Sequence, residues 1–167
     1  MKRNITHTAV TILFFTTLYM SLVPAARAED ENACSTAKAA GKWGFILSGT
    51  LLLPTGPVLG AGVGTATIDT AGNISGTEVR NLGGGFATET LTGTWTVNSD
   101  CTGTVSLQAY ESGVLVRTST LSLVFVNKLK EILMVQQSLT QQPGGAILPV
   151  VITADGKRLF PQSSNQQ

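Results

Sequence analysis

The strongest constraint on the fold is a strict alternation of side chains between residues 86 and 97. Threonine occupies every second position on one face, and residues that are mostly apolar or small occupy the other. The two faces read Thr88, Thr90, Thr92, Thr94, Thr96 and Ala87, Leu91, Gly93, Trp95, Val97. A period of two is typical of a half-buried β-strand, because successive side chains point to opposite faces of a sheet. The segment predicts a strand whose apolar face is interrupted once, by Glu89.

A turn and a second strand follow directly. Residues 98–103 contain Asn, Ser, Asp and Gly. These residue types favour turns because their side chains bond nearby backbone or tolerate positive φ. Val105, Leu107 and Ala109 then alternate with polar residues up to Tyr110. Residues 86–110 therefore predict a β-hairpin.

Short alternating segments with turn residues between them recur along the rest of the chain. With the hairpin they give about eight expected strands, at residues 42–52, 62–69, 74–81, 86–97, 104–110, 114–126, 131–138 and 146–153. We expect Asp155–Gly156 to turn the chain after the last of them. No amphipathic segment is long enough to cover a sheet as a helix. The pattern predicts an all-β fold with antiparallel strands in an up-and-down closed barrel. A Greek-key β-sandwich is the alternative, because periodicity does not separate the two.

Two of the expected strands indicate how the interior is filled. In the first, Trp43 and Phe45 share a face, so we expect the strand to present its aromatic side chains to the core. In the second, the face that holds Gly62 and Gly64 is unusually small. Such a face favours close approach by a neighbouring group.

Residues 1–28 have the three parts of a secretory signal. Lys2 and Arg3 are basic, residues 9–23 are largely apolar, and residues 26–28 form a small-x-small cleavage site. A transmembrane anchor is the alternative. The apolar run contains threonines, however, and ends at Pro24, shorter than the ~20 residues that a span needs. We therefore expect a secreted or periplasmic protein with no stable membrane span after cleavage.

The mature chain is long enough for one domain, since removal of 28 of the 167 residues leaves 139. We expect an N-terminal lead-in at 29–41, a single barrel domain at 42–160 and a disordered, glutamine-rich tail at 161–167. The mature chain has 8 basic and 10 acidic residues, and the basic ones are scattered. This charge distribution argues against nucleic acid or an anionic membrane as a partner.

The mature chain contains no histidine, because the single one, His7, lies in the signal segment. Ser-His-Asp and Cys-His nucleophile systems, histidine bases and histidine-containing zinc sites are therefore excluded. Any catalysis would rest on carboxylates, lysine, arginine or Tyr110. The sequence predicts no catalytic residue, no cofactor and no metal site.

Cys34 and Cys101 are the only cysteines. In an exported chain they predict one disulfide, which would tie the N-terminal segment to the turn of the hairpin. A reactive thiol or a two-cysteine metal site is the alternative. Neither cysteine lies in a CxxC spacing or beside a histidine, as those sites would favour.

Glu89 and Arg117 are the two charged residues that the alternation places most directly on inward faces. Inside a barrel they would pair, or would offer a polar anchor to a ligand in an otherwise apolar cavity, so both are candidate ligand-binding residues. The alternative is that each lies solvated near a barrel mouth, or that a register shift of one residue turns it outward. Glu78 and Arg80 are a weaker case of the same kind, sharing a face with Ile74.

Three stretches carry a likeness to known sequences: WGFILSGT at residues 43–50, GTWTVNSDCTGT at residues 93–104, and the turn at residues 127–132. They resemble a family of secreted bacterial proteins described as calycin-like or allene-oxide-cyclase-like barrels. The chain departs from the family's pattern where Trp43 and Trp95 replace tyrosines. The resemblance implies a barrel fold and export, and it implies no activity and no catalytic residue.

Together these features predict an exported, non-catalytic β-barrel that binds a small apolar ligand or a surface partner. One alternative is a barrel enzyme of the cyclase or isomerase type, which would use an interior carboxylate such as Glu89. Another is a structural envelope protein whose barrel is filled. A pocket of a few hundred Å³ beside Glu89 or Arg117 would favour the ligand hypotheses, because ligand sites are cavities of about that size.

Overall fold

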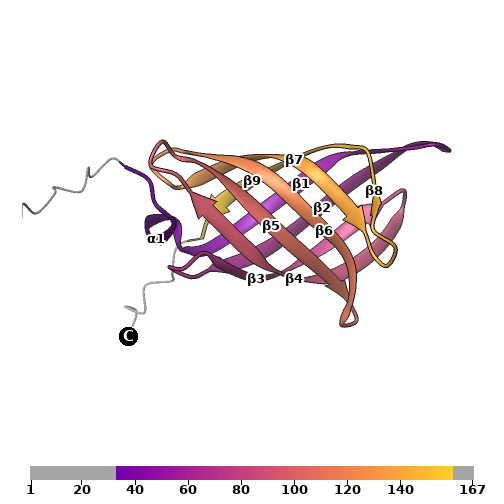
Figure 1. Cartoon of the computed structure of the whole chain (residues 1–167), viewed down its shortest axis with the longest axis horizontal. Helices are drawn as coiled ribbons and strands as arrows, with labels where there is room; N and C mark the ends of the chain where they lie inside the picture. Colours follow the sequence, from indigo (N-terminus) through magenta and orange to yellow (C-terminus); the bar gives the residue numbers. More distant parts are fainter. Residues whose placement is uncertain (1–32, 160–167) are drawn as a thin grey trace, which may run out of the picture. The chain divides into compact units, whose positions relative to one another are not determined.

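Eight long strands follow one another as antiparallel hairpins and close into a barrel in the computed structural model, which describes residues 33–159 (Figure 1). The elements are α1 (Thr36–Ala39), β1 (Gly41–Leu53), β2 (Gly56–Ile68), β3 (Asn73–Leu82), β4 (Gly85–Val97), β5 (Thr102–Glu111), β6 (Val114–Val126), β7 (Glu131–Gln141), β8 (Ala146–Ile147) and β9 (Val150–Arg158). Strand β9 pairs with both β1 and β7, which closes the sheet. The short β8 adds to β7 outside this circuit. The predicted up-and-down barrel is confirmed, and the sandwich alternative is wrong.

The alternation along each strand separates an interior from an exterior as predicted. Leu91, Trp95 and the exceptional Glu89 are all buried, whereas the threonines of β4 lie outside or at intermediate depth. In β1, Trp43 and Phe45 both point inward, where they line a cavity. The predicted signal segment at 1–28 and tail at 161–167 lie outside the described residues.

The small face of β2 allows close packing inside the barrel, as expected. A Cβ atom built on Gly64 would lie 2.6 Å from the ring of Phe45 and 2.3 Å from the carbonyl oxygen of Thr77. Both separations are shorter than van der Waals contact. Only glycine therefore lets the Phe45 ring of β1 approach β2 this closely at Gly64.

Three predicted boundaries are wrong. The strand predicted at 146–153 is interrupted, since β8 ends at Ile147 and β9 begins at Val150. The other two errors arise from turn-like residues inside strands. Asp155 and Gly156 do not turn the chain; they lie within β9, where Gly156 is paired with Phe45 on one side and Ile132 on the other. Strand β2 begins at Gly56 rather than at Gly62, so only Pro54 and Thr55 connect it to β1. Strand pairing overrides local turn preference at these positions: Gly156 is paired with strands on both sides, and residues 56–59 of β2 are paired with β1 alone.

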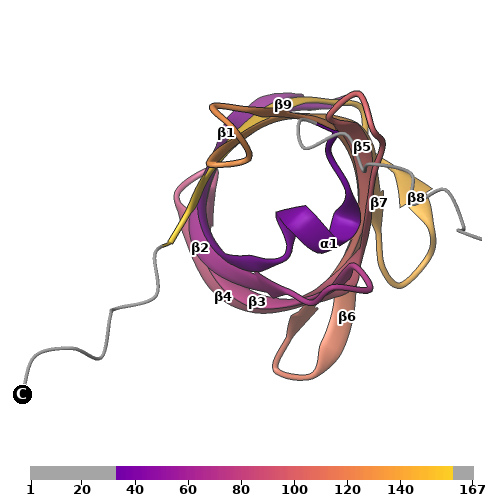
Figure 2. The same cartoon turned by 90° about the vertical axis from the view of Figure 1, so that its left-hand side faces the viewer.

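One end of the barrel is plugged by the N-terminal segment. Helix α1 lies across this opening (Figure 2). The predicted disulfide joins Cys34 to Cys101 in the turn between β4 and β5. Ser35 caps the helix, since its Oγ accepts a hydrogen bond from the backbone N–H of Lys38 at 3.2 Å. The plug is therefore tied covalently to the β4–β5 hairpin, whose strands the sequence predicts most clearly.

Three aromatic rings pack beneath the helix. Trp43 lies 6.0 Å from Trp95 and 5.8 Å from Phe125, measured between ring centroids, and Trp95 lies 5.4 Å from Phe125. The indole Nε1–H of Trp43 donates a hydrogen bond to the carbonyl oxygen of Ala39 at 3.1 Å. The two contacts of Trp95 are edge-to-face, an arrangement that is favourable beyond the apolar area it buries. This aromatic cluster fills the α1 end of the interior.

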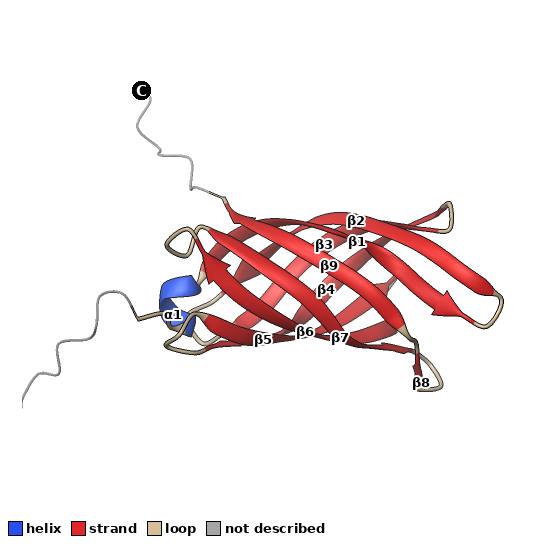
Figure 3. Ribbon diagram, turned by 90° about the horizontal axis from the view of Figure 1, so that it is seen from above, coloured by secondary structure: helices blue, strands red, loops and turns tan. Residues whose placement is uncertain are grey.

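No element of the described chain lies across the opposite end of the barrel (Figure 3). This end is formed by the β1–β2, β3–β4 and β5–β6 turns and by the β7–β9 connection that contains β8. Within residues 33–159, no helix has the length and apolarity needed to cross a bilayer.

Candidate functional site

A cavity of about 420 Å³ opens at the end of the barrel opposite α1, and we call it the mouth pocket. Its wall is mainly aliphatic. The apolar lining residues are Leu47, Leu51, Leu53, Leu82, Val116, Leu139, Leu148 and Ile152. Three of them, Leu51, Leu139 and Ile152, are buried and form a small core of their own. Part of the pocket wall is therefore fixed by the packing of these strand residues against one another.

Charged side chains form the floor of this pocket. Glu78 on β3 and Glu89 on β4 stand directly opposite each other in the strand register, and both point inward. Two carboxylates in that position repel each other unless cations separate them. Arg80, two residues along β3, and Arg117 from β6 supply those cations.

The two arginines hold the carboxylates through a continuous set of ion pairs, which we call the charged floor. Arg117 donates to Glu89 through Nε (3.0 Å) and to Glu78 and Glu89 through Nη2. Arg80 donates to Glu89 through Nε, and its Nη2 lies 3.7 Å from a carboxylate oxygen of Glu111 at the rim. Glu89 thus receives hydrogen bonds from both arginines. It is the centre of the charged floor.

The burial of these four residues is unequal. Glu89 is 1% exposed and Glu78 is 3% exposed. The side chains of Arg80 and Arg117 are 26% and 22% exposed, respectively. Of the charged-floor residues that line the mouth pocket, the arginines therefore present the larger exposed fractions to a molecule that enters it.

Small neighbours make room for the two arginines. In the strand register, Arg80 stands between Gly62 of β2 and Ala87 of β4. Arg117 is paired with Ala109 of β5 and reaches across that strand to Glu89 on β4. A large side chain at Ala109 would lie in this path, because neighbouring strands are only about 5 Å apart.

The two carboxylates differ in acidity. Burial raises the pKa of Glu78, with a further rise from the charge of Glu89, and the opposing attraction of Arg117 does not cancel these effects. Burial also acts to raise the pKa of Glu89, but the hydrogen bonds and charges of Arg117 and Arg80 outweigh it, so the pKa of Glu89 is lowered. Glu78 is therefore the member of the charged floor that takes up a proton first.

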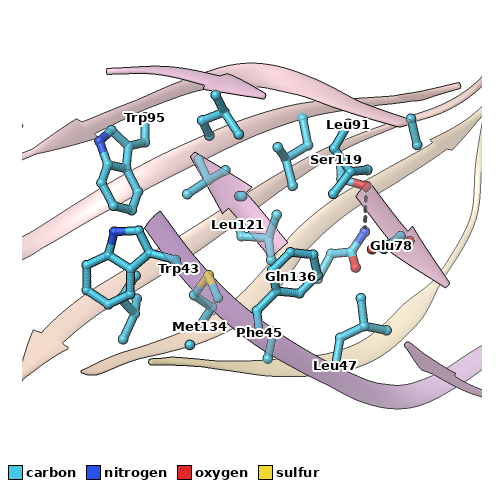
Figure 4. Close-up of a pocket in the computed structure, with 18 of the residues that line it drawn as sticks. Trp43, Phe45, Leu47, Glu78, Leu91, Trp95, Ser119, Leu121, Met134 and Gln136 are labelled. Atoms are coloured by element: carbon cyan, nitrogen blue, oxygen red, sulfur yellow. Dashed lines mark hydrogen bonds between the residues drawn. The ribbon is translucent and has the colours of Figure 1, made fainter. Parts of the chain in front are cut away.

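A second, smaller cavity of about 90 Å³ lies between the charged floor and the aromatic cluster. Figure 4 shows Trp43 and Trp95 at one end of it and Ser119, Gln136 and Glu78 toward the other. Gln136 donates a hydrogen bond from Nε2 to the Oγ of Ser119 at 3.2 Å. Leu47, Glu78, Arg117 and Ile152 line both cavities. The charged floor thus separates the two spaces.

The residues singled out in the sequence are brought together. Glu89 and Arg117 both point inward and pair directly, and Glu78 and Arg80 join them. The role of Glu89 and Arg117 in ligand binding stays a prediction. Sequence reasoning missed Glu111, and it missed the leucines of the pocket wall. The alternation identifies inward leucines, but it does not tell which of them surround empty space.

Comparisons with known proteins support the barrel fold but identify no family. No protein-family model matches the chain. No curated protein sequence matches it. Two solved structures of barrels are similar. The redesigned β-barrel mFAP1, bound to DFHBI, is 14% identical with a TM-score of 0.48, covering 74% of this chain and 97% of that chain. EF1p2_mFAP2b, bound to DFHBI, is 10% identical with a TM-score of 0.51, covering 74% of this chain and 98% of that chain. At this identity the second likeness shows a shared barrel fold alone.

Proposed function

We propose that the protein is an exported, non-catalytic binding protein whose mouth pocket holds a small, largely apolar ligand with one polar or anionic group. The observation that carries this proposal is the mouth pocket itself, with its aliphatic wall and its charged floor. A volume of about 420 Å³ falls within the roughly 300–1,000 Å³ of typical ligand pockets. The inner cavity of about 90 Å³ is too small for such a ligand.

The charged floor favours an anionic group on the ligand. Arg80 and Arg117 are the partly exposed members, and guanidinium groups bind carboxylates and phosphates through paired hydrogen bonds. With both glutamates ionised, the four charges balance. Uptake of a proton by Glu78, whose pKa is raised, leaves one excess positive charge that a ligand anion would neutralise.

Export and a calycin-like relationship belong to the same proposal. A disulfide between Cys34 and Cys101 suits an oxidising compartment. The secretory features of residues 1–28 and the resemblance to secreted bacterial barrels support the same location. A solved barrel of similar fold holds DFHBI, so the architecture is compatible with a small-molecule ligand.

Native mass spectrometry of the protein purified from its own compartment tests the proposal. We expect a reproducible mass excess that denaturation releases.

Binding of 8-anilinonaphthalene-1-sulfonate, an apolar anion whose fluorescence rises in apolar sites, provides a defined probe. Leu82→Trp fills the pocket from β3, whereas Val79→Trp adds the same side chain to the outer face of that strand. We expect the first variant to lower probe affinity at least about tenfold and the second to leave it unchanged. Equal effects, or no binding by the wild-type protein, would overturn the proposal.

A second candidate function is proton transfer to or from a bound ligand at Glu78. The observation that favours it is the raised pKa of a carboxyl group that lines both cavities. Glu89, whose pKa is lowered by its arginine partners, is a poorer acid–base group. Once native mass spectrometry has identified a ligand, incubation in D₂O tests this function. Deuterium uptake that Glu78→Gln abolishes would support it, and no uptake by the wild-type protein would exclude it.

A further inference from the structure

Charged residues are distributed unequally along the barrel axis. Of the fifteen charged residues between 33 and 159, ten lie in the half that contains α1: Lys38, Lys42, Asp69, Asp100, Lys128, Lys130, Glu131, Asp155, Lys157 and Arg158. Four of the other five belong to the charged floor, inside the barrel. Within the described residues, Glu111 is therefore the one charge of the mouth half outside the charged floor, and it lines the pocket opening 3.7 Å from Arg80.

Apolar side chains replace charges around the mouth. We define the apolar rim as the exposed residues Leu52, Leu59, Phe86, Val114, Ile147 and Val151. Their exposed fractions run from 47% at Leu52 to 76% at Phe86 and Ile147. All four connections at this end contribute, since each rim residue lies in or beside one of them. The rim is thus a ring around the pocket opening rather than a patch on one side.

We propose that the apolar rim docks this end of the barrel onto a zwitterionic lipid surface. Exposed apolar residues gathered on one face mark an interaction site, and insertion of apolar side chains into the headgroup region is driven by the area they bury. An anionic surface is disfavoured, because outward lysines and arginines lie in the other half of the described structure. The surface that suits an uncharged apolar ring is therefore one without net charge.

The shape of this end favours a fluid surface over a second copy of the chain. The β1–β2 hairpin, which carries Leu52 and Leu59, projects well beyond the neighbouring turns (Figure 1). Turns of unequal reach sink to unequal depths in lipid. Two rigid rims would meet at the longest hairpins first and leave the other apolar residues in water.

Docking in this orientation places the opening of the mouth pocket against the lipid. The aliphatic wall of the pocket is then continuous with the rim, from Leu53 and Leu82 inward to Leu139. An apolar molecule dissolved in the lipid would reach the charged floor without crossing water. Lipid docking by the apolar rim does not require a ligand in the mouth pocket. The test of docking is therefore independent of the proposed ligand binding.

Co-sedimentation with vesicles of dioleoylphosphatidylcholine tests the proposal. The protein is used as exported, and mass spectrometry first establishes that residues 1–28 have been removed, because the apolar run 9–23 would bind lipid by itself. We expect the wild-type protein to bind these vesicles equally at about 0.05 and 0.5 M NaCl, since apolar insertion is not screened by salt. Leu59→Asp with Phe86→Asp should lower the partition coefficient at least about tenfold.

The matched control places the same charges on the barrel wall. Val63 and Val135 are 59% and 50% exposed and lie away from the rim, so Val63→Asp with Val135→Asp should leave vesicle binding unchanged. Circular dichroism establishes that both double variants are folded. Four results would overturn the proposal: no binding by the wild-type protein at millimolar lipid, binding only to vesicles with anionic lipid, equal losses in the two double variants, or a rim-dependent dimer that does not bind vesicles.

Discussion

The two ends of the barrel are built from the same eight strands and the same inward alternation, yet they hold opposite contents. At the α1 end the inward residues are Trp43, Trp95 and Phe125, and a helix and a disulfide close the opening. At the mouth the inward residues are leucines of moderate size and four charged side chains, and a pocket of about 420 Å³ stays open. Barrel closure fixes the width of the interior. The volumes of the inward side chains decide whether that width is filled or hollow.

This difference predicts that stability and the proposed ligand binding depend on different ends of the barrel. Charges removed from water cost free energy, which their partners only partly return. The charged floor therefore adds little net stability, and the aromatic cluster and the disulfide supply stability at the other end. If the two ends have these separate roles, substitutions at the plug should change folding, and substitutions at the mouth should change binding and pH dependence.

The largest expected effect is in the aromatic cluster that packs beneath the plug. Trp43→Ala removes a side chain that is buried and packed against two other aromatic rings. It should lower the free energy of unfolding by roughly 3–5 kcal/mol, because a large cavity replaces the indole. Ile46→Ala, on the exposed face of the same strand, should change it by about 0.5 kcal/mol or less. Denaturant unfolding measures both. A cost for Trp43→Ala as small as that of the control would mean that the aromatic cluster does not stabilise the barrel.

The disulfide should have the next largest effect. Cys34 and Cys101 are 67 residues apart in the chain, so their bond restricts a long loop of the unfolded protein. Cys34→Ser with Cys101→Ser should lower the free energy of unfolding by about 2–4 kcal/mol. A reductant should destabilise the wild-type protein to the same extent and leave the double variant unchanged. Probe binding in the mouth pocket should survive in the folded double variant; its loss would show that the two ends are coupled.

Much of this architecture was predictable from the sequence, for a simple physical reason. The period of two decides which face of a strand points inward. It therefore predicts the inward side chains without knowledge of the neighbouring strands, and these include Trp43, Leu91, Trp95 and Glu89. Turn chemistry was less reliable, because Asp155 and Gly156 lie within a strand that is paired on both sides. Local preference at such positions yields to the hydrogen bonds of two neighbouring strands.

The candidate site was predictable in its members but not in its geometry. The alternation predicts that Glu89 and Arg117 both point inward. It does not predict that Arg117 on β6 reaches across Ala109 of β5 to the carboxylate of Glu89 on β4. That meeting depends on strand register and on the small side chain between them. The open mouth was not predictable either, since empty space is what remains after all inward side chains have been placed in three dimensions.

The smallest effect, and the most specific to the mouth, is an opposite pH response of two facing glutamates. Because the pKa of Glu78 is raised in the folded protein, ionisation of Glu78 costs stability above its ordinary value of 4.5. Because the pKa of Glu89 is lowered, ionised Glu89 contributes stability above 4.5 that is lost as the pH falls through the lowered value. Glutamine at each position removes the corresponding titration and keeps a similar shape.

Unfolding of Glu78→Gln and Glu89→Gln across about pH 3 to 8 therefore sharpens the comparison between the two ends. Relative to the wild-type protein, Glu78→Gln should become more stable as the pH rises above 4.5, and Glu89→Gln should become less stable as the pH rises toward 4.5. Trp43→Ala should shift stability equally at every pH, because no titrating group of the charged floor touches the aromatic cluster. Parallel pH profiles for the two glutamine variants would mean that Arg80 and Arg117 do not distinguish the carboxylates. In that case the charged floor would offer no excess positive charge to an anionic group of the proposed ligand.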